Sequence, residues 1–398
     1  MVPRPLTAAR ALALREGLRV WAEIDLDRLA ANTRALKAEA GDARLLAVIK
    51  ANAYGHGSLP VARAALAAGA WGLGVAGVEE GEELRRGGVD APVLVLGSIS
   101  PAAAAGAVAA DLRPTVADRE VVGALSRAAV ESGREALIHV KVETGLNRYG
   151  LRLEEAVTLA EEARGLPGLR VEGLATHLAS VDEGDKAFTN EQFRLFQLCA
   201  ERLPWIPLHH IASTGAVLDL PETRLALVRT GIGLYGYYPS PTVSRSATIT
   251  PVLALRSRIA RVATVEAGES VGYARDWVAP RRSRIATVMA GYGDGVRRSL
   301  SGRGVALVRG HRLPFVGRVA MDMLMVDATT LPAAATEDEV TLIGDQGPAS
   351  LDADEVGGLA GTISYEILAG IAARVPRLYT REGRVVARQD LAGYHEEP

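Results

Sequence analysis

Apolar, β-branched runs bounded by turn residues recur through the first half of the chain, and stretches with helical periodicity and charged faces lie between most of them. Segments that alternate in this way indicate an α/β fold. Eight of them predict an N-terminal (β/α)8 barrel of the TIM type, although an open doubly wound sheet follows the same local pattern. The predicted strands are Leu45–Lys50, Trp71–Ala76, Val93–Gly97, Leu112–Val116, Leu137–Glu143, Leu169–His177, Leu208–Ala212 and Leu225–Arg229.

The pattern changes after Tyr238. The Ser/Thr-rich segment Thr242–Thr250 is typical of a linker, and beyond it apolar runs follow one another with glycine-rich turns and little helix between them. We therefore predict a barrel domain over residues 14–240 and a C-terminal mainly-β domain over residues 250–390. Residues 18–25 alternate between apolar and polar positions, and they are a candidate strand of either domain.

Composition restricts the class of protein further. Aromatic residues make up only 5 % of the chain, and the formal net charge is −2 with the arginines dispersed. Without a basic stripe, neither nucleic acid nor an anionic membrane is an expected partner. Cys199 is the only cysteine, so an intrachain disulfide and a cysteine-based zinc site are excluded, and no metal site is expected. Met1–Gly17 lacks the apolar core of a signal peptide, and no stretch approaches the roughly 20 apolar residues of a membrane span, so we expect a cytoplasmic protein.

Chemically distinctive side chains fall at the carboxyl ends of the predicted barrel strands. In a closed barrel these ends share one mouth, and the loops after the last two strands often bind phosphate. Only four of the 45 basic side chains are lysines. An amine, unlike a guanidinium, can be deprotonated and can condense with an aldehyde, so Lys50 is a candidate Schiff-base lysine; a lysine that snorkels at a strand end is the alternative. The strand-end set consists of Lys50, Arg148, His177, Ser213, Thr214 and Arg229, with Gly231, Ile232 and Gly233 after it.

Two further patterns have ordinary explanations. Gly231–Gly236 matches the G-x-G-x-x-G fingerprint of dinucleotide sites, but Tyr237–Pro239 interrupts any following helix and Pro251–Arg256 offers no carboxylate for a ribose. The glycines can still present backbone N–H groups to a phosphate monoester. The neighbours His209 and His210 point to opposite faces of a strand and form a poor metal pair, so we expect both to be hydrogen-bonded strand residues.

The segment Lys50–Gly57 resembles the pyridoxal-phosphate lysine motif of bacterial alanine racemases, which are fold-type III enzymes. Other segments resemble motifs of the same family, in the expected order, along nearly the whole chain. These segments are Lys141–Arg148, Thr176–Ala179, Val228–Gly236, Val271–Tyr273, Gly291–Gly295, Gly317–Asp322 and Ile363–Glu366. The chain departs from the family at small residues: Ser213-Thr214 stands where many relatives have Asn-Ser, Ala320 where a cysteine is common, and Ala274 where a glycine usually follows the tyrosine.

The resemblance implies a pyridoxal 5'-phosphate-dependent racemase that interconverts L- and D-alanine, and D-alanine is a precursor of peptidoglycan. It implies that Lys50 carries the cofactor and that Arg229 faces the pyridine nitrogen. An arginine cannot accept a proton there, so the ring stays unprotonated and is a weaker electron sink. The resemblance further implies cofactor contacts for Tyr54, Arg148, His177, Ser213, Thr214, Gly231, Ile232 and Tyr365, and substrate-carboxylate contacts for Arg148 and Met321.

Racemisation removes a proton from one face of Cα and delivers another to the opposite face, so two acid/base groups must flank that carbon. The resemblance assigns Lys50 to the proton of the D-enantiomer and Tyr273 to that of the L-enantiomer. It also implies a homodimer in which each site combines the barrel of one subunit with the β domain of the other. For Lys141, which shares a strand face with Glu143, two interpretations stay open: a carbamylated lysine that braces Arg148, or an ion pair with Glu143.

Alternative functions differ in substrate or in reaction. The enzyme could racemise another amino acid or a broader range of them. A fold-type III decarboxylase would use the same barrel and cofactor, but those enzymes generally place a glutamate at the pyridine nitrogen, where this chain offers Arg229. A non-catalytic carrier of the cofactor would need only the barrel, and the length of 398 residues and the motifs at Tyr273 and Met321 disfavour it.

Overall fold

The structure is a computed structural model that describes residue 15 and residues 17–396. The segment Met1–Gly17, where no signal peptide is predicted, lies mostly outside the described residues. The chain divides into two compact units. One consists of residues 28–53 and 58–250, and the other consists of the chain up to Asp27, residues 54–57 and the chain from Pro251 onwards.

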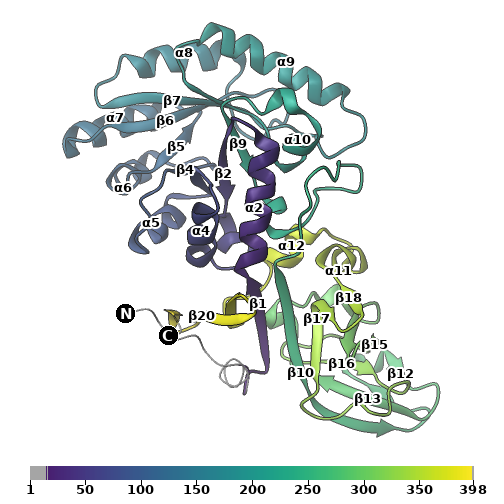
Figure 1. Cartoon of the computed structure of the whole chain (residues 1–398). Helices are drawn as coiled ribbons and strands as arrows, with labels where there is room; N and C mark the ends of the chain where they lie inside the picture. The colour runs from purple at the N-terminus through teal and green to yellow at the C-terminus, as the bar shows by residue number, and fades with distance from the viewer. Residues whose placement is uncertain (1–14, 16, 397–398) are drawn as a thin grey trace. The chain divides into compact units, whose positions relative to one another are not determined.

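The first unit is a parallel barrel (Figure 1). Among the described residues, eight strands pair in the order β8-β7-β6-β5-β4-β3-β2-β9. The two end strands of this order also meet, since the N–H of Ala226 donates to the carbonyl of His209 (3.3 Å) and the N–H of Arg229 donates to the carbonyl of Ala212 (2.9 Å). The sheet therefore closes on itself, and the predicted (β/α)8 barrel is confirmed. The strands are β2 (Arg44–Val48), β3 (Gly72–Val75), β4 (Val93–Val95), β5 (Arg113–Val116), β6 (Ala136–Lys141), β7 (Leu169–Ala175), β8 (Leu208–His210) and β9 (Leu227–Thr230).

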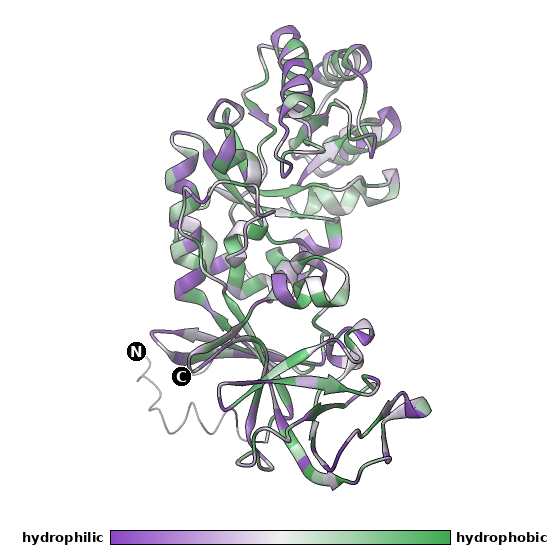
Figure 2. Ribbon diagram, turned by 90° about the vertical axis from the view of Figure 1, so that its right-hand side faces the viewer, coloured by the Kyte–Doolittle hydropathy of each residue, from purple (hydrophilic) through white to green (hydrophobic). Residues whose placement is uncertain are grey.

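Helices cover the outside of the barrel and turn their apolar faces to it, as the hydropathy colouring in Figure 2 shows. Helix α7 illustrates the local causes: the Asp118 carboxylate accepts the N–H groups of Glu120 and Val121 at its start, and Gly133 ends it with a left-handed φ of 64°. The helices are α2 (Leu26–Ala40), α4 (Ser58–Ala67), α5 (Val78–Arg86), α6 (Ala104–Ala109), α7 (Arg119–Ser132), α8 (Leu153–Arg164), α9 (Ala187–Arg202) and α10 (Thr214–Asp219).

The second unit is mainly β, as predicted. Its sheet runs β18-β17-β14-β15-β16-β13-β10-β1-β19-β20-β21, and a further pairing of β17 with β10 closes the central part into a ring. Strand β1 (Val20–Asp25) pairs antiparallel with β10 and parallel with β19, so the early strand belongs to this sheet. The other elements are β10 (Leu253–Val265), β13 (Ser283–Val288), β14 (Val305–Val308), β15 (His311–Val316), β16 (Leu324–Asp327), β17 (Glu339–Gln346), β18 (Ala349–Leu351), α11 (Ala353–Ala360), α12 (Ser364–Ala369), β19 (Arg377–Arg381), β20 (Arg384–Asp390) and β21 (Gly393–Glu396).

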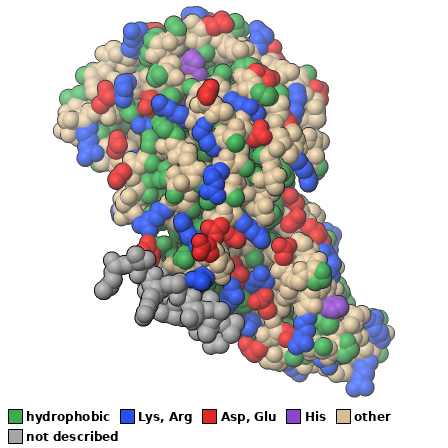
Figure 3. Space-filling model, in the orientation of Figure 1, with side chains coloured by type: hydrophobic (Ala, Val, Ile, Leu, Met, Phe, Trp, Pro, Cys, Tyr) green, Lys and Arg blue, Asp and Glu red, His purple; other side chains and the backbone are tan. Residues whose placement is uncertain are grey.

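The surface carries charges of both signs. On the face drawn in Figure 3, Lys and Arg side chains alternate with Asp and Glu side chains over both units. Exposed ion pairs such as Arg119 with Glu162 (2.6 Å) and Arg194 with Glu191 (2.7 Å) contribute little to stability individually. In the described part of the chain, no helix combines the length and the apolar character needed to cross a membrane.

Candidate active site

The chain turns sharply after β2, at the motif that begins with Lys50. Residues 51–54 all have φ between 52° and 53°, so they form one left-handed helical turn although none of them is glycine. This conformation costs an L-residue about 1–2 kcal/mol. The Glu80 carboxylate offsets part of that strain, because it accepts the N–H groups of Ala51 (2.7 Å) and Ala76 (2.6 Å). Backbone strain of this kind concentrates at functional sites.

Lys50 lies at the start of this turn and is partly buried. Burial and the nearby Arg148 guanidinium lower the pKa of its amine, and the Glu80 carboxylate opposes that shift. A lowered pKa increases the fraction of neutral amine, which is the form that attacks a carbonyl group. The pKa of Lys50 is therefore shifted in the direction that favours a Schiff-base lysine.

Arg229 projects from β9 into the interior of the barrel and is 6 % exposed. Its Nη2 donates to the carbonyls of Thr176 (2.8 Å) and Ile211 (3.0 Å), and the same atom lies 3.3 Å from Nδ1 of His177. Its Nη1 donates to Nδ1 of His210 (2.8 Å). Burial lowers the pKa of Arg229 to about 10, which still leaves a cation at neutral pH. These contacts fix the guanidinium in one orientation.

A chain of hydrogen bonds continues from Arg229 across the barrel. Nε2 of His210 lies 2.8 Å from Nδ1 of His139, and Nε2 of His139 lies 3.2 Å from the Glu172 carboxylate, which also pairs with Arg113 (3.1 Å). A guanidinium can only donate, so Nδ1 of His210 accepts and its Nε2 carries the proton; the same reasoning makes Nδ1 of His139 the acceptor and its Nε2 the donor. Burial lowers the pKa of both imidazoles, which stay neutral. In this relay, which runs through His210 and His139, every N–H group therefore points from Arg229 towards Glu172.

The sequence interpretation missed this relay. It treated His210 as an ordinary strand histidine and gave no role to His139 or Glu172. Gly173 on the intervening strand β7 leaves the necessary space, because a Cβ built there would stand 2.0 Å from Nδ1 of His139. Histidines at interior-facing positions of nearby strands, with a glycine between them, are the signal that could have indicated it. For His209 the prediction of a satisfied ring is wrong, since its buried Nε2 has no hydrogen-bond partner among the described residues.

Lys141 lies inside the barrel and is 7 % exposed. Burial, and then the cations Arg229 and Arg148, lower its pKa well below the ordinary value, which favours the neutral form of its amine. Among the ion pairs of the described residues, none joins Lys141 to Glu143. The Glu143 carboxylate instead accepts the N–H of Gly145 (2.6 Å). The Glu143 charge still opposes the lowering of the Lys141 pKa, so both interpretations of Lys141 stay open.

The loops after β8 and β9 are tied together at Thr214. Its Oγ1 accepts the N–H groups of Gly231 (3.1 Å) and Gly233 (3.5 Å). Ser213 is the residue before α10, and Ile232 begins a short 3-10 turn, Ile232–Tyr235. That turn ends at Gly236 with a left-handed φ of 89°. Only this short turn follows Gly231, which also argues against the dinucleotide interpretation.

The remaining predicted residues lie in the second unit. The rings of Tyr54 and Tyr365 are 6.1 Å apart, and burial raises the pKa of Tyr54 to about 12, so its hydroxyl remains a donor. Tyr273 and Met321 are 70 % and 52 % exposed. Ala274 has φ of 57°, a conformation in which a glycine would carry no strain.

The barrel residues of the predicted site do come together. The charges of Arg229, Lys141, Arg148 and Lys50 all act on His177 and, after the effect of burial, lower its pKa further. A cluster of this kind, with an amine that can be neutral beside fixed cations and N–H donors, suits an anionic ligand that carries an aldehyde. In the second unit, Tyr54 and Tyr365 lie near one another, and the same unit holds Tyr273 and Met321.

Comparisons with known proteins agree with one family. The family described as "Alanine racemase, N-terminal domain" matches residues 24–239, and "Alanine racemase, C-terminal domain" matches residues 252–379. The alanine racemase of Symbiobacterium thermophilum is 43 % identical over 372 residues, which cover 92 % of this chain and 99 % of that protein. That of Desulfosudis oleivorans is 42 % identical over 374 residues, which cover 90 % and 96 %.

Solved structures agree with the sequence relatives. The alanine racemase of Clostridium difficile 630 superposes with a TM-score of 0.91 at 33 % identity, and the match covers 94 % of this chain and 99 % of that one. The alanine racemase of Streptomyces coelicolor A3(2) gives a TM-score of 0.86 at 36 % identity, with 94 % and 100 % of the two chains covered.

Proposed function

The chain belongs to the alanine racemase family, and from that premise we propose that it interconverts L- and D-alanine with pyridoxal 5'-phosphate as cofactor and with Lys50 and Tyr273 as its two bases. The observation that carries the proposal is the state of Lys50: it begins a strained left-handed turn at the mouth of the barrel, and its pKa is lowered. Arg229 disfavours the decarboxylase alternative, because a glutamate generally stands there in those enzymes.

The residues present fit this cofactor. Lys50 offers an amine to the aldehyde and Arg229 offers a buried cation for the ring nitrogen. The Thr214 hydroxyl, which accepts the N–H of Gly231, keeps its own O–H to donate, and it would hold the phosphate. Tyr54 adds a phenol that stays protonated. When bound, the cofactor supplies an electron sink that makes the Cα proton of the substrate acidic.

Arg229 controls the strength of that sink. Its N–H groups already donate to Thr176, Ile211 and His210, and a guanidinium has no acceptor. It can therefore only donate to the ring nitrogen, which stays unprotonated. A weaker sink restrains side reactions such as transamination.

The two bases act from opposite faces of Cα. Nζ of Lys50 exchanges a proton with the D-enantiomer, and Oη of Tyr273 exchanges one with the L-enantiomer. Arg148 and a backbone group of Met321 would hold the substrate carboxylate, so Cα stays between the two bases during both transfers. His177 lies 3.3 Å from Nη2 of Arg229, and it would pack against the ring of the bound cofactor and hold Arg229.

Lys141 is the proposed carbamylated lysine. Its neutral amine is the form that reacts with carbon dioxide: a bond forms between Nζ and the carbon, and Nζ releases a proton to water. The product is an anion, and the neighbouring Arg148 and Arg229 favour it for the same reason that they disfavour an ammonium. The carbamate would brace Arg148.

The resemblance also supports three broader proposals. The protein forms a homodimer whose sites combine residues of both subunits. It acts in the cytoplasm on a free amino acid. Its product, D-alanine, serves peptidoglycan synthesis.

The test combines a substrate panel with one variant. The purified protein, supplied with the cofactor, is incubated with single amino acids, and the loss of optical activity is followed. We expect alanine to racemise, whereas Lys50→Arg should lose both activity and a borohydride-reducible adduct at residue 50. Lys37→Arg, at another of the four lysines, is the control and should behave as the wild type. Release of carbon dioxide from the amino acid without racemisation would favour a decarboxylase, and a better substrate than alanine would favour the broader racemase.

A further inference from the structure

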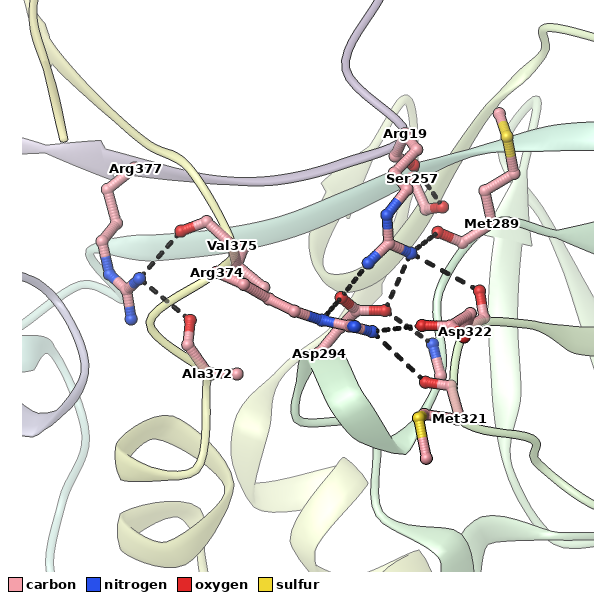
Figure 4. Close-up of polar contacts among 11 residues, drawn as sticks. Arg19, Ser257, Met289, Asp294, Met321, Asp322, Ala372, Arg374, Val375 and Arg377 are labelled. Atoms are coloured by element: carbon pink, nitrogen blue, oxygen red, sulfur yellow. Dashed lines mark hydrogen bonds and ion pairs between the residues drawn. The ribbon is translucent and has the colours of Figure 1, made fainter. Parts of the chain in front are cut away.

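Asp294 is a fully buried carboxylate in the second unit, and both of its oxygens are bound (Figure 4). Arg19 donates to Oδ1 (2.5 Å) and to Oδ2 (3.1 Å), Nε of Arg374 donates to Oδ1 (2.8 Å), and the N–H of Gly291 donates to Oδ2 (3.0 Å). Two guanidinium groups from distant parts of the chain therefore meet on one carboxylate. A buried charge with this number of donors is stable only where the geometry is well defined.

Arg374 extends this contact to the loop that contains Met321. Its Nη2 donates to the Asp322 carboxylate (2.7 Å) and to the carbonyl of Met321 (3.4 Å), as Figure 4 shows. The backbone segment that holds Arg374 is itself fixed, because Arg377 donates to the carbonyls of Ile371 (3.0 Å) and Val375 (2.8 Å). Arg374 thus links Asp294 rigidly to the Met321 loop.

A second set of bonds joins the same loop to the turn that carries Asp294. The N–H of Tyr292 donates to the carbonyl of Ala320 (2.9 Å), and the N–H of Gly293 donates to the carbonyl of Met321 (2.9 Å). The approach is close enough to require glycine at Gly291, where a Cβ would lie 2.2 Å from the carbonyl oxygen of Ala320. The two turns are packed backbone against backbone.

The direction of the Met321 N–H follows from these bonds. The peptide unit between Ala320 and Met321 is planar and trans, so its C=O and N–H point in opposite directions. Since the C=O of Ala320 points at the N–H of Tyr292, the N–H of Met321 points away from the Asp294 turn. A substrate carboxylate can only accept hydrogen bonds, so the backbone group of Met321 that binds it must be this N–H.

We propose that Asp294 is a positioning residue for substrate binding: through Arg19 and Arg374 it holds the turn at Gly291–Asp294 against the loop at Ala320–Asp322, and it thereby aims the N–H of Met321 at the substrate carboxylate. The inference rests on the proposed function, since that function gives Met321 its substrate. Asp294 is fully buried, and its side-chain partners among the described residues are protein groups. Its effect is therefore on recognition of the carboxylate and not on proton transfer.

The test is Asp294→Asn, which keeps the shape of the side chain but places an NH2 group among N–H donors. We expect KM for L- and D-alanine to rise together by about tenfold, the effect of one misdirected charge-assisted hydrogen bond, while kcat changes by less than about threefold. Binding of propionate, which has the carboxylate of alanine without its amine, should weaken by the same factor. Binding of L-alaninamide, which lacks the carboxylate, should not change. In the cofactor-free protein, amide hydrogen exchange across residues 317–323 should become faster.

Asp338→Asn is the matched control, because Asp338 pairs with Arg309 (2.7 Å) in the same unit and makes no contact with the Met321 loop. It should leave KM, propionate binding and exchange in residues 317–323 unchanged. If Asp294→Asn does not fold, Arg374→Lys provides the test, because one ammonium cannot reach Asp294, Asp322 and the Met321 carbonyl together. It should also raise KM and weaken propionate binding, and it should leave alaninamide binding unchanged.

The outcomes separate the two ideas. A folded Asp294→Asn or Arg374→Lys protein with unchanged KM and unchanged propionate affinity would overturn the positioning role. A wild-type protein that neither racemises alanine nor binds propionate would instead overturn the proposed function. Equal weakening of propionate and alaninamide would also count against the inference, because it would show a general loss of the site.

Discussion

Nε2 of His210 lies 2.8 Å from Nδ1 of His139 inside the barrel, and the direction of this hydrogen bond is fixed by what lies at its two ends. Arg229 at one end has only donors, and Glu172 at the other end has only acceptors when ionised. A neutral imidazole has one donor nitrogen and one acceptor nitrogen. The two rings can therefore accept from Arg229 and donate to Glu172 only if Nδ1 is the acceptor and Nε2 the donor in both. The cation proposed to face the cofactor is thus linked, through uncharged rings, to a carboxylate on the same barrel.

The first prediction concerns the tautomers of these rings. Nitrogen NMR of histidine side chains should show Nε2 protonated and Nδ1 unprotonated at both His139 and His210, with no imidazolium at neutral pH, because burial and the Arg229 charge lower the pKa of both residues. His210→Phe should lower the free energy of unfolding by about 1–3 kcal/mol for each polar group left without a partner. The neighbouring His209→Phe is the control, since Nε2 of His209 has no partner to lose. A proton on Nδ1 of either ring would rule out the directed relay.

The second prediction concerns the pH dependence of stability at Lys141. In cofactor-free protein without carbon dioxide, its amine is neutral when folded above its lowered pKa, and it is protonated when unfolded up to about pH 10.4. Unfolding therefore takes up a proton in this window, so the stability of the wild type rises with pH there, and the burial penalty is largest at low pH. Lys141→Met removes this contribution. Urea unfolding measures the free energy of unfolding of both proteins. The variant should exceed the wild type most at low pH, and the difference between them should shrink as the pH approaches 10. A difference that does not change with pH would contradict the lowered pKa.

The left-handed turn after β2 gives the third prediction. Ala51 is exposed and has φ of 53°. Ala51→Gly should relieve about 1–2 kcal/mol of backbone strain, but an unfolded glycine has more conformational entropy to lose than an unfolded alanine. The free energy of unfolding should therefore stay the same or rise by up to about 1 kcal/mol. Ala31 is also exposed but lies in the right-handed helix α2, and Ala31→Gly should lower stability by about 1 kcal/mol. Thermal and urea unfolding of the two variants provide the comparison. Equal destabilisation by both substitutions would mean that the turn is not left-handed in solution.

The sequence predicts the elements of this fold better than their contacts. Apolar runs and helical periodicity are local properties of the sequence, so they are sufficient to predict the barrel strands and the mainly-β second unit. Strand β1 could not be assigned, because its partners β10 and β19 come from the last part of the chain. The left-handed turn could not be predicted either, since alanine favours a right-handed helix and the compensating Glu80 lies on another element.

The site shows the same division. Residues at strand ends, such as Lys50 and Arg229, are marked by their position and by family motifs. His139 and His210 are 71 positions apart, and they meet only because β6, β7 and β8 are consecutive in the barrel. Asp294 and Arg374 are 80 positions apart, and nothing in either local pattern indicates that they pair.

The fourth prediction tests the two-base proposal at Tyr273. Tyr273→Phe removes the base on one face only, so abstraction of the proton from L-alanine should suffer directly. Turnover in both directions must fall together, because the equilibrium between enantiomers is fixed by chemistry outside the enzyme. Exchange of the α-proton with solvent deuterium should survive better from D-alanine, which still has Lys50. Equal loss of exchange from both enantiomers would contradict the assignment of one base to each face.

The last prediction tests the shared site of the proposed homodimer. Lys50→Ala and Tyr273→Ala should each be inactive alone. After reversible dissociation and mixing, about half of the dimers combine one subunit of each kind if pairing is random. If each site takes Lys50 from one subunit and Tyr273 from the other, a mixed dimer has one site with both lesions and one site with neither. Activity should therefore recover to about a quarter of the wild-type value.

Reassociation of each variant with itself is the control, and it should stay inactive. Native mass spectrometry measures the fraction of mixed dimers, because the two substitutions remove different masses. Recovered activity should scale with that fraction as the mixing ratio is varied, reaching its maximum at equal amounts. Mixed dimers without activity would show that each subunit builds its site from its own chain, and Lys50 and Tyr273 would then have to act within one protomer.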